Sequence, residues 1–107
     1  MSSGADEAIE GRYAIAVSAM GREKAGMLSL GRPRGGQVDG VVEMLGRRVE
    51  APGLSVDHGA VTGAVIADTP MGRMRLGIRA KVIDGHISGR IGAPVGKASF
   101  EGDRVDG

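Results

Sequence analysis

The sequence predicts an all-β protein made of two tandem antiparallel meanders of about 50 residues each. Three observations support this prediction: a repeat along the chain, an alternation of apolar and polar residues with a period of two, and glycine-rich turn signals between the alternating stretches. Each meander must bury one face. The two can close into a small pseudo-twofold barrel, which we favour, or pack face to face as a β-sandwich.

The repeat is visible in short segments that recur in the same order. Residues 18–24 (SAMGREK) return as TPMGRMR at 69–75, and residues 36–42 (GQVDGVV) return as GHISGRI at 85–91. In a chain with 20 glycines, some glycines match by chance, but several of the matched positions are not glycine. The repeat divides one β domain, 11–107, into the units 11–58 and 59–107, after an N-terminal tail, 1–10, that we expect to be flexible.

The alternation is clearest in the second unit. Over 73–82, one face of the predicted strand is apolar and the other carries arginine, lysine and glycine, as in a half-buried strand. The first unit is predicted to form strands at about 11–19, 24–31, 37–43, 46–50 and 54–57. Their counterparts in the second unit are about 60–68, 73–82, 86–92, 96–100 and 103–106. In a closed barrel, segment 11–19 would pair with the last of these strands and remove two sheet edges.

Turn residues separate the predicted strands. Asp84-Gly85 is a strong signal for a two-residue hairpin, and Gly35-Gly36 is its counterpart in the first unit. Gly40 and Gly89 lie inside the third predicted strand of each unit, where glycine indicates a bulge or a close approach of two backbones.

Composition excludes several classes of protein. The chain has no cysteine, so disulfide scaffolds and cysteine-ligated zinc modules are excluded. With 41% hydrophobic residues and a net charge of +1, most of the chain does not resemble a disordered protein. No apolar run approaches the roughly 18 residues of a membrane-spanning helix, and no targeting segment is recognisable. We therefore expect a cytoplasmic protein that interacts with neither membrane nor nucleic acid, since a charge of +1 requires no polyanionic partner.

The second unit resembles the small bacterial β-meander modules that read TPMG…DG…SG…GD..DG. The residues that carry the resemblance are Thr69, Pro70, Met71, Gly72, Asp84, Gly85, Ser88, Gly89, Gly102, Asp103, Val105, Asp106 and Gly107. The first unit departs from the pattern, with SAMG in place of TPMG and VDG in place of ISG, and Tyr13 stands where such modules often have an aromatic residue. The resemblance implies a β fold and no catalytic residues.

The joint between the two units is the favoured place for a binding site, because barrel mouths host ligands. Tyr13, Asp57, His58 and Asp68 are expected at or near this joint, and His58 could act as a general base with Asp57 or Asp68. His86 follows the Asp84-Gly85 turn and is the second of two histidines. Alternatively, all of these residues are solvated groups at turns and strand ends.

Other chemistry is weakly indicated. Arg73, Arg75, Arg79 and Lys81 on one strand face could bind phosphates, as could Arg32 and Arg34, but a solvated face that resists aggregation is the favoured interpretation. No nucleophile motif or phosphate-binding loop is present, since GAPVGK at 92–97 is too short. We expect no metal site and no cofactor.

Three functions remain open. The favoured one is a non-catalytic β-barrel module that binds a small, largely apolar ligand or a partner protein. The second is a small acid–base enzyme, or an accessory subunit of isomerase or cyclase type, that uses a His/Asp pair. The third is a structural domain for oligomerisation, with a homodimer as the simplest assembly.

Overall fold

The computed structural model describes residues 9–44, 46–69, 72–93 and 96–105. It contains eight strands: β1 Gly11–Ala19, β2 Arg22–Leu30, β3 Gln37–Met44, β4 Arg47–Asp57, β5 Ala60–Thr69, β6 Gly72–Ile83, β7 His86–Ala93 and β8 Gly96–Arg104. No helix among the described residues is long and apolar enough to cross a membrane.

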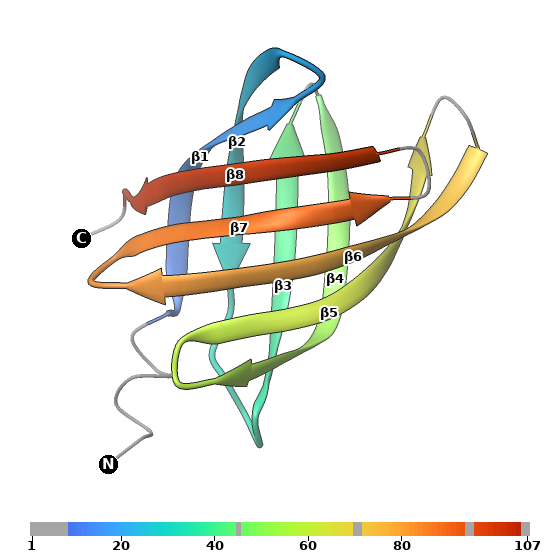
Figure 1. The fold of residues 1–107 in the computed structure, drawn as a ribbon. Coiled ribbons are helices and arrows are strands. Elements are labelled where there is room, and N and C mark those ends of the chain that lie inside the picture. Colours follow the sequence, from blue (N-terminus) through green and yellow to red (C-terminus); the bar gives the residue numbers. More distant parts are fainter. Residues whose placement is uncertain (1–8, 45, 70–71, 94–95, 106–107) are drawn as a thin grey trace.

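The eight strands form a closed antiparallel barrel in which each strand pairs with the next along the chain and β1 pairs with β8. Figure 1 shows β1–β4 running roughly upright and β5–β8 crossing them in a second curved layer. The predicted all-β barrel is therefore confirmed, including the pairing of residues 11–19 with the last strand of the second unit. The barrel has two ends. We call the end where β1 begins the entry end, and the other the far end.

Each half of the barrel contributes four strands, whereas five were predicted. The predicted strands 46–50 and 54–57 are one strand, β4, and the chain between them forms a bulge instead of a turn. Val38 and Gly40 on β3 lie opposite Leu54 and Ala51, so β4 carries one residue more than β3 over this stretch. Gly53 adopts φ +68° in the bulge, and its N–H donates to the Asp39 carboxylate at 2.8 Å. The glycine that indicated a turn in the sequence thus forms part of a bulge within one strand.

The predicted strands 96–100 and 103–106 are likewise one strand, β8, with Asp106 outside the described residues. Gly102 lies in this strand because the β1 backbone passes directly against it. A Cβ atom on Gly102 would overlap the Ala14 carbonyl oxygen. This glycine therefore marks a close approach of two strands, not the end of one.

Two-residue turns connect strands at the entry end. His58-Gly59 and Asp84-Gly85 have positive φ at both positions, which is the geometry whose twist matches that of the flanking strands. Gly35-Gly36 also has positive φ at both residues and is closed by Arg34 and Gln37, which exchange backbone hydrogen bonds of 2.8 and 2.9 Å. Both predicted hairpin turns are confirmed.

Gly40 and Gly89 differ more than the repeat suggests. The register of β3 shifts next to Gly40, whereas that of β7 is continuous with both neighbours. Gly89 instead allows close packing, because a Cβ there would come within 2.6 Å of the Arg79 carbonyl oxygen and 2.8 Å of Phe100 Cζ. The predicted bulge occurs beside Gly40, and the predicted close approach occurs at Gly89.

The core fills the barrel with small aliphatic side chains. Tyr13, Ile9, Ile87, Val38 and Val61 are the largest side chains that are fully buried. Ile9 was assigned to the flexible tail, yet it belongs to the core, and its carbonyl oxygen accepts a 2.7 Å hydrogen bond from the Tyr13 hydroxyl. Because its side chain is buried in the core, Ile9 does not belong to the flexible tail that the sequence predicted. Residues 1–8 lie outside the described part of the chain.

Candidate functional site

Two joints connect strands β1–β4 with strands β5–β8, one between β4 and β5 and one between β8 and β1. The β8–β1 joint contains six register pairs, from Tyr13–Arg104 to Ser18–Ser99. The β4–β5 joint contains only three, which join Ser55–Asp57 to Ala60–Thr62. The joint that the sequence singled out is therefore the weaker of the two.

Beyond those three pairs, β4 and β5 separate. The Leu54 side chain lies against Gly63, where a Cβ atom would come within 2.6 Å of Leu54 Cδ2. Past that contact, no register pair joins β4 to β5 among the described residues, although β4 stays paired with β3 and β5 with β6. Figure 1 shows the two strands diverging from their shared turn. We call this opening between Arg47–Leu54 and Gly63–Thr69 the seam.

The β4 side of the seam has the features of a protected strand edge. Pro52 has no N–H to offer, and proline is confined to edges and bulges in sheets. Arg48 and Glu50 are exposed and lie 3.9 Å apart, as Arg48 Nε to Glu50 Oε2. Proline and charged side chains discourage pairing with another strand.

The β5 side of the seam lacks such protection. Asp57 and Ala60 flank a two-residue turn and therefore form a hydrogen-bonded pair. Since backbone groups alternate sides along a strand, the N–H and C=O groups of Ala64 and Ile66 face the seam. From Gly63 to Ala67 the side chains are uncharged, and Ile66 is 61% exposed. This stretch is a bare strand edge.

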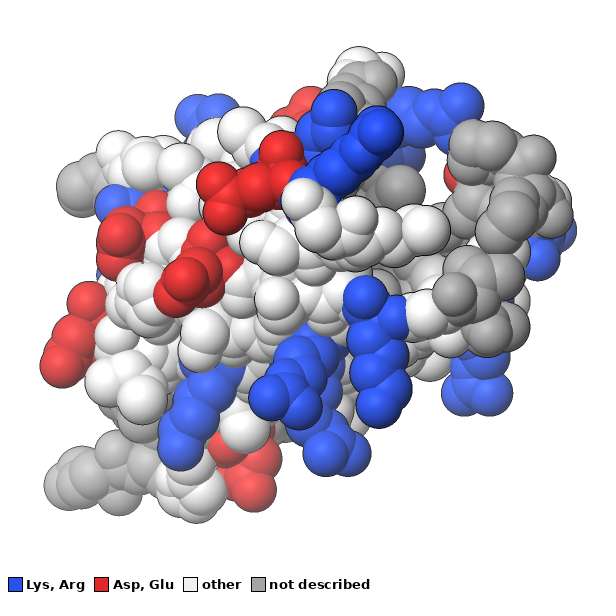
Figure 2. Space-filling model, turned by 45° about the horizontal axis from the view of Figure 1, so that its top comes forward, with Lys and Arg blue, Asp and Glu red and all other residues white. Residues whose placement is uncertain are grey.

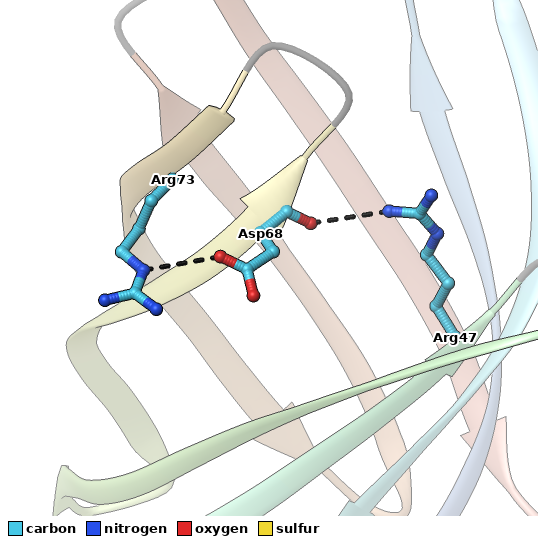
Figure 3. Close-up of polar contacts among 3 residues, drawn as sticks. All are labelled: Arg47, Asp68 and Arg73. Carbon is cyan, nitrogen blue, oxygen red and sulfur yellow. Dashed lines mark hydrogen bonds and ion pairs between the residues drawn. The ribbon is translucent and has the colours of Figure 1, made fainter.

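A side-chain contact spans the seam at its far end. Arg47 on β4 donates from Nη1 to the backbone oxygen of Asp68 on β5 at 3.5 Å, and Arg73 Nε lies 3.3 Å from Asp68 Oδ1 (Figure 3). The Arg73 and Asp68 side chains are largely exposed, so their ion pair adds little stability. This long Arg47 contact joins β4 and β5 at one point where the two strands form no register pair.

Asp57 and His58 lie at the opposite end of β5 from Asp68. His58 Nε2 is 3.4 Å from Asp57 Oδ1, and the His58 side chain is 69% exposed. The strand from Ala60 to Asp68 separates the two ends by about 26 Å at roughly 3.3 Å per residue. His58 and Asp68 therefore share no cavity, and the geometry does not bring them together as an acid–base pair.

Tyr13 is a core residue and does not line the seam. Besides its bond to Ile9, its hydroxyl oxygen accepts a 2.9 Å hydrogen bond from Arg104 Nη2, and the Arg104 guanidinium carbon lies 5.4 Å from the centre of the tyrosine ring. These contacts tie the entering chain, β1 and β8 together. The role of Tyr13 is therefore to secure the β8–β1 joint.

The structure also forms a histidine–carboxylate cluster that the sequence analysis missed. His86 Nδ1 lies 2.8 Å from Asp103 Oδ1, and His86 Nε2 lies 3.5 Å from Glu101 Oε2. The hydrogen bond to Asp103, aided by the charges of both carboxylates, raises the pKa of His86 above its usual value. The register of β7 and β8 places His86 opposite Asp103, so strand register was the signal that could have found this pair.

The interior offers little space for a ligand. A cavity of about 60 Å³ lies among apolar core side chains that include Leu28, Leu54 and Phe100. Pockets that hold drug-sized ligands measure about 300–1,000 Å³. Among the described residues, no group of three or more His, Cys, Asp or Glu side chains could hold a metal ion.

Comparison with protein-family models, curated proteins and solved structures gives no match for this chain.

Proposed function

We propose that this chain is a non-catalytic binding module that accepts an extended segment of a partner protein along the bare edge of β5. The observation that carries the proposal is the three-pair β4–β5 joint, which leaves the backbone groups of Ala64 and Ile66 facing an open seam. Strand addition to such an edge is a recurrent mode of peptide recognition, in which backbone hydrogen bonds supply affinity.

The small interior cavity favours a protein partner over a small apolar ligand. About 60 Å³ accommodates no more than a few small atoms, well below the pockets that bury most of a ligand. The seam, by contrast, runs along the seven residues Gly63–Thr69, about 23 Å of strand. A partner strand placed there would continue the β5–β6 sheet.

The two sides of the seam favour one orientation of docking. Proline and charge on the β4 edge oppose pairing there, so the partner would pair with β5. The Arg47 contact to the Asp68 backbone oxygen occupies the position where a partner N–H would donate. Docking would therefore exchange a 3.5 Å side-chain contact for a backbone hydrogen bond.

Selection from a displayed library of random ten-residue peptides tests the proposal. Ala64→Pro removes a backbone N–H that faces the seam and leaves the β5–β6 ladder intact, while Ile66→Lys places a charge on the bare edge. We expect peptides selected on the wild-type protein to bind both variants at least about tenfold more weakly, since backbone pairing supplies their affinity.

Ile83→Lys is the matched control, because Ile83 is 59% exposed and lies on β6, away from the seam. It should leave peptide binding unchanged. A library that yields no peptide sensitive to the edge variants, or peptides equally sensitive to Ile83→Lys, contradicts the proposal.

A further inference from the structure

A second surface, on the outer face of β6, β7, β8 and β1, gathers basic side chains away from the seam. An open groove of about 660 Å³ runs over it, lined by Arg79, Lys81 and Arg90 on one side and by Glu23 and Glu101 on the other. In Figure 2, basic side chains gather across the lower middle of the molecule and acidic side chains at its left, while both kinds lie side by side at the top. We call Arg79, Lys81 and Arg90 the basic face.

Strand register brings the basic face together with hydroxyl groups in one row. Arg79 lies directly opposite Arg90, and Arg90 directly opposite Ser99. The row continues to Thr62 on one side and Ser18 on the other. Two guanidinium groups are thus flanked by three exposed hydroxyls across five neighbouring strands.

Like charges directly opposite each other destabilise a sheet, so the Arg79–Arg90 pair has a cost. Within the described ranges, no ion pair is formed by Arg79, Lys81 or Arg90. Glu101, one of the two acids that line the groove, lies with its Oε2 3.5 Å from His86 Nε2. Among the residues that the structure describes, no carboxylate therefore relieves this repulsion by forming an ion pair.

Protection against aggregation does not explain the basic face. Charged side chains serve that purpose on strand edges, but Arg79, Lys81 and Arg90 lie where β6 and β7 are paired on both sides. The edge-protection interpretation therefore does not extend to Arg79 and Lys81. It remains a prediction for Arg73 and Arg75, which precede the β6–β7 ladder.

We propose that the row centred on Arg79 and Arg90 binds a soluble ligand through a phosphate group. Guanidinium groups match phosphate oxygens in bidentate geometry, and hydroxyl groups can donate to the remaining oxygens. A dianionic group would also relieve the repulsion between the two arginines. The only aromatic residues, Tyr13 and Phe100, are buried, so the row offers no surface on which bases could stack.

Calorimetric titration with inorganic phosphate and pyrophosphate at constant ionic strength tests this site. Arg79→Gln and Arg90→Gln should each weaken pyrophosphate binding at least about fivefold, because each removes a charge-assisted contact. Arg34→Gln is the matched control, with the same change in charge on an exposed arginine in the β2–β3 turn, and should change the affinity less than about twofold.

Three further results separate a phosphate site from general attraction of anions. Arg90→Lys should weaken binding although it keeps the charge, because lysine lacks the planar fork. Inorganic phosphate should bind more weakly as the pH falls through neutrality, because its dianion takes up a proton and loses one charge. Succinate should bind less tightly than pyrophosphate. Full affinity in Arg90→Lys, equal loss in Arg34→Gln, or equal binding of succinate would overturn the proposal, as would a short duplex DNA that binds more tightly than pyrophosphate.

Discussion

The two joints of the barrel both connect strands β1–β4 with strands β5–β8, yet they differ in their register pairs and side-chain contacts. The β8–β1 joint has six register pairs, and the Tyr13 hydroxyl adds hydrogen bonds to Ile9 and Arg104. The β4–β5 joint has three register pairs and one long side-chain contact, from Arg47 to the Asp68 backbone. One joint closes the barrel, and the other leaves a strand edge open.

Local sequence explains the difference. In β8, Gly102 lets the β1 backbone approach to a distance that no other residue allows. In β4, the extra residue near Pro52 and Gly53 forms a bulge, and bulges bend a strand and increase its twist. The bulge thus turns β4 away from β5. Pro52 has no N–H and could not donate a hydrogen bond to β5 at this position.

The largest effect should come from filling the closed joint. Gly102→Ala places a Cβ atom on the Ala14 carbonyl oxygen, a backbone atom that cannot move without breaking the ladder. We expect a loss of about 3 kcal/mol or more, at the upper end of overpacking costs. Gly63→Ala at the open joint would bring a Cβ within 2.6 Å of the end of the Leu54 side chain but no closer than 3.5 Å to the Leu54 backbone, and it should cost roughly 1 kcal/mol. Urea denaturation of both variants measures the difference, and equal losses would contradict the proposed contrast.

Tyr13→Phe should have the next largest effect. It removes only the hydroxyl and leaves the Ile9 carbonyl oxygen without that donor in the core, at a cost of about 1–2 kcal/mol for a lost buried hydrogen bond. The measurement is the midpoint of urea denaturation at unchanged slope. A variant as stable as the wild-type protein would show that the hydroxyl does not secure the closed joint.

The fold was largely predictable because its signals are local. Alternation identified most strands, and the Asp84-Gly85 and Gly35-Gly36 turns followed from glycine chemistry. The merging of strands in β4 and β8 was not predictable, since Gly53 and Gly102 look like turn residues in the sequence and reveal their roles only through neighbouring strands. Ile9 was missed because its burial depends on Tyr13 in the next segment.

The candidate site was predictable only in outline. The joint between the units was singled out, and it is the open one. The predicted site residues were not brought together. Asp57 and His58 precede β5 and Asp68 lies near its other end, and an extended strand holds these positions about 26 Å apart. The seam itself depends on a bulge, and His86 meets Asp103 only through the register of β7 and β8.

A smaller effect is expected from pH, on the β7–β8 hairpin beside the closed joint. The hydrogen bond to Asp103 raises the pKa of His86 in the folded protein. Protonated His86 therefore stabilises the fold below the unfolded-state pKa of about 6.5, and this contribution is lost as pH rises through the raised folded value. Denaturation midpoints measured across this range should show a decline that Asp103→Asn reduces. If the midpoint declines equally in Asp103→Asn, the His86–Asp103 pair is not the cause of the decline.

The smallest effect should come from Arg47→Gln at the seam. Its contact to Asp68 is long and exposed, so stability should change by less than about 0.5 kcal/mol. The expected change is in binding, since the variant frees the Asp68 backbone oxygen for a partner strand. Peptides selected on the wild-type protein should bind the variant at least as tightly. A large loss of stability would show that this contact holds the seam together.

Amide hydrogen exchange measured by NMR tests the contrast between the joints most directly. By the alternation of backbone groups, the amides of Ala14 and Ala16 face β8 at the closed joint, and those of Ala64 and Ile66 face the seam. The first two should exchange slowly, through opening of the barrel, and the last two near the rate of an unstructured chain. Equal protection of all four amides would mean that β5 has no free edge.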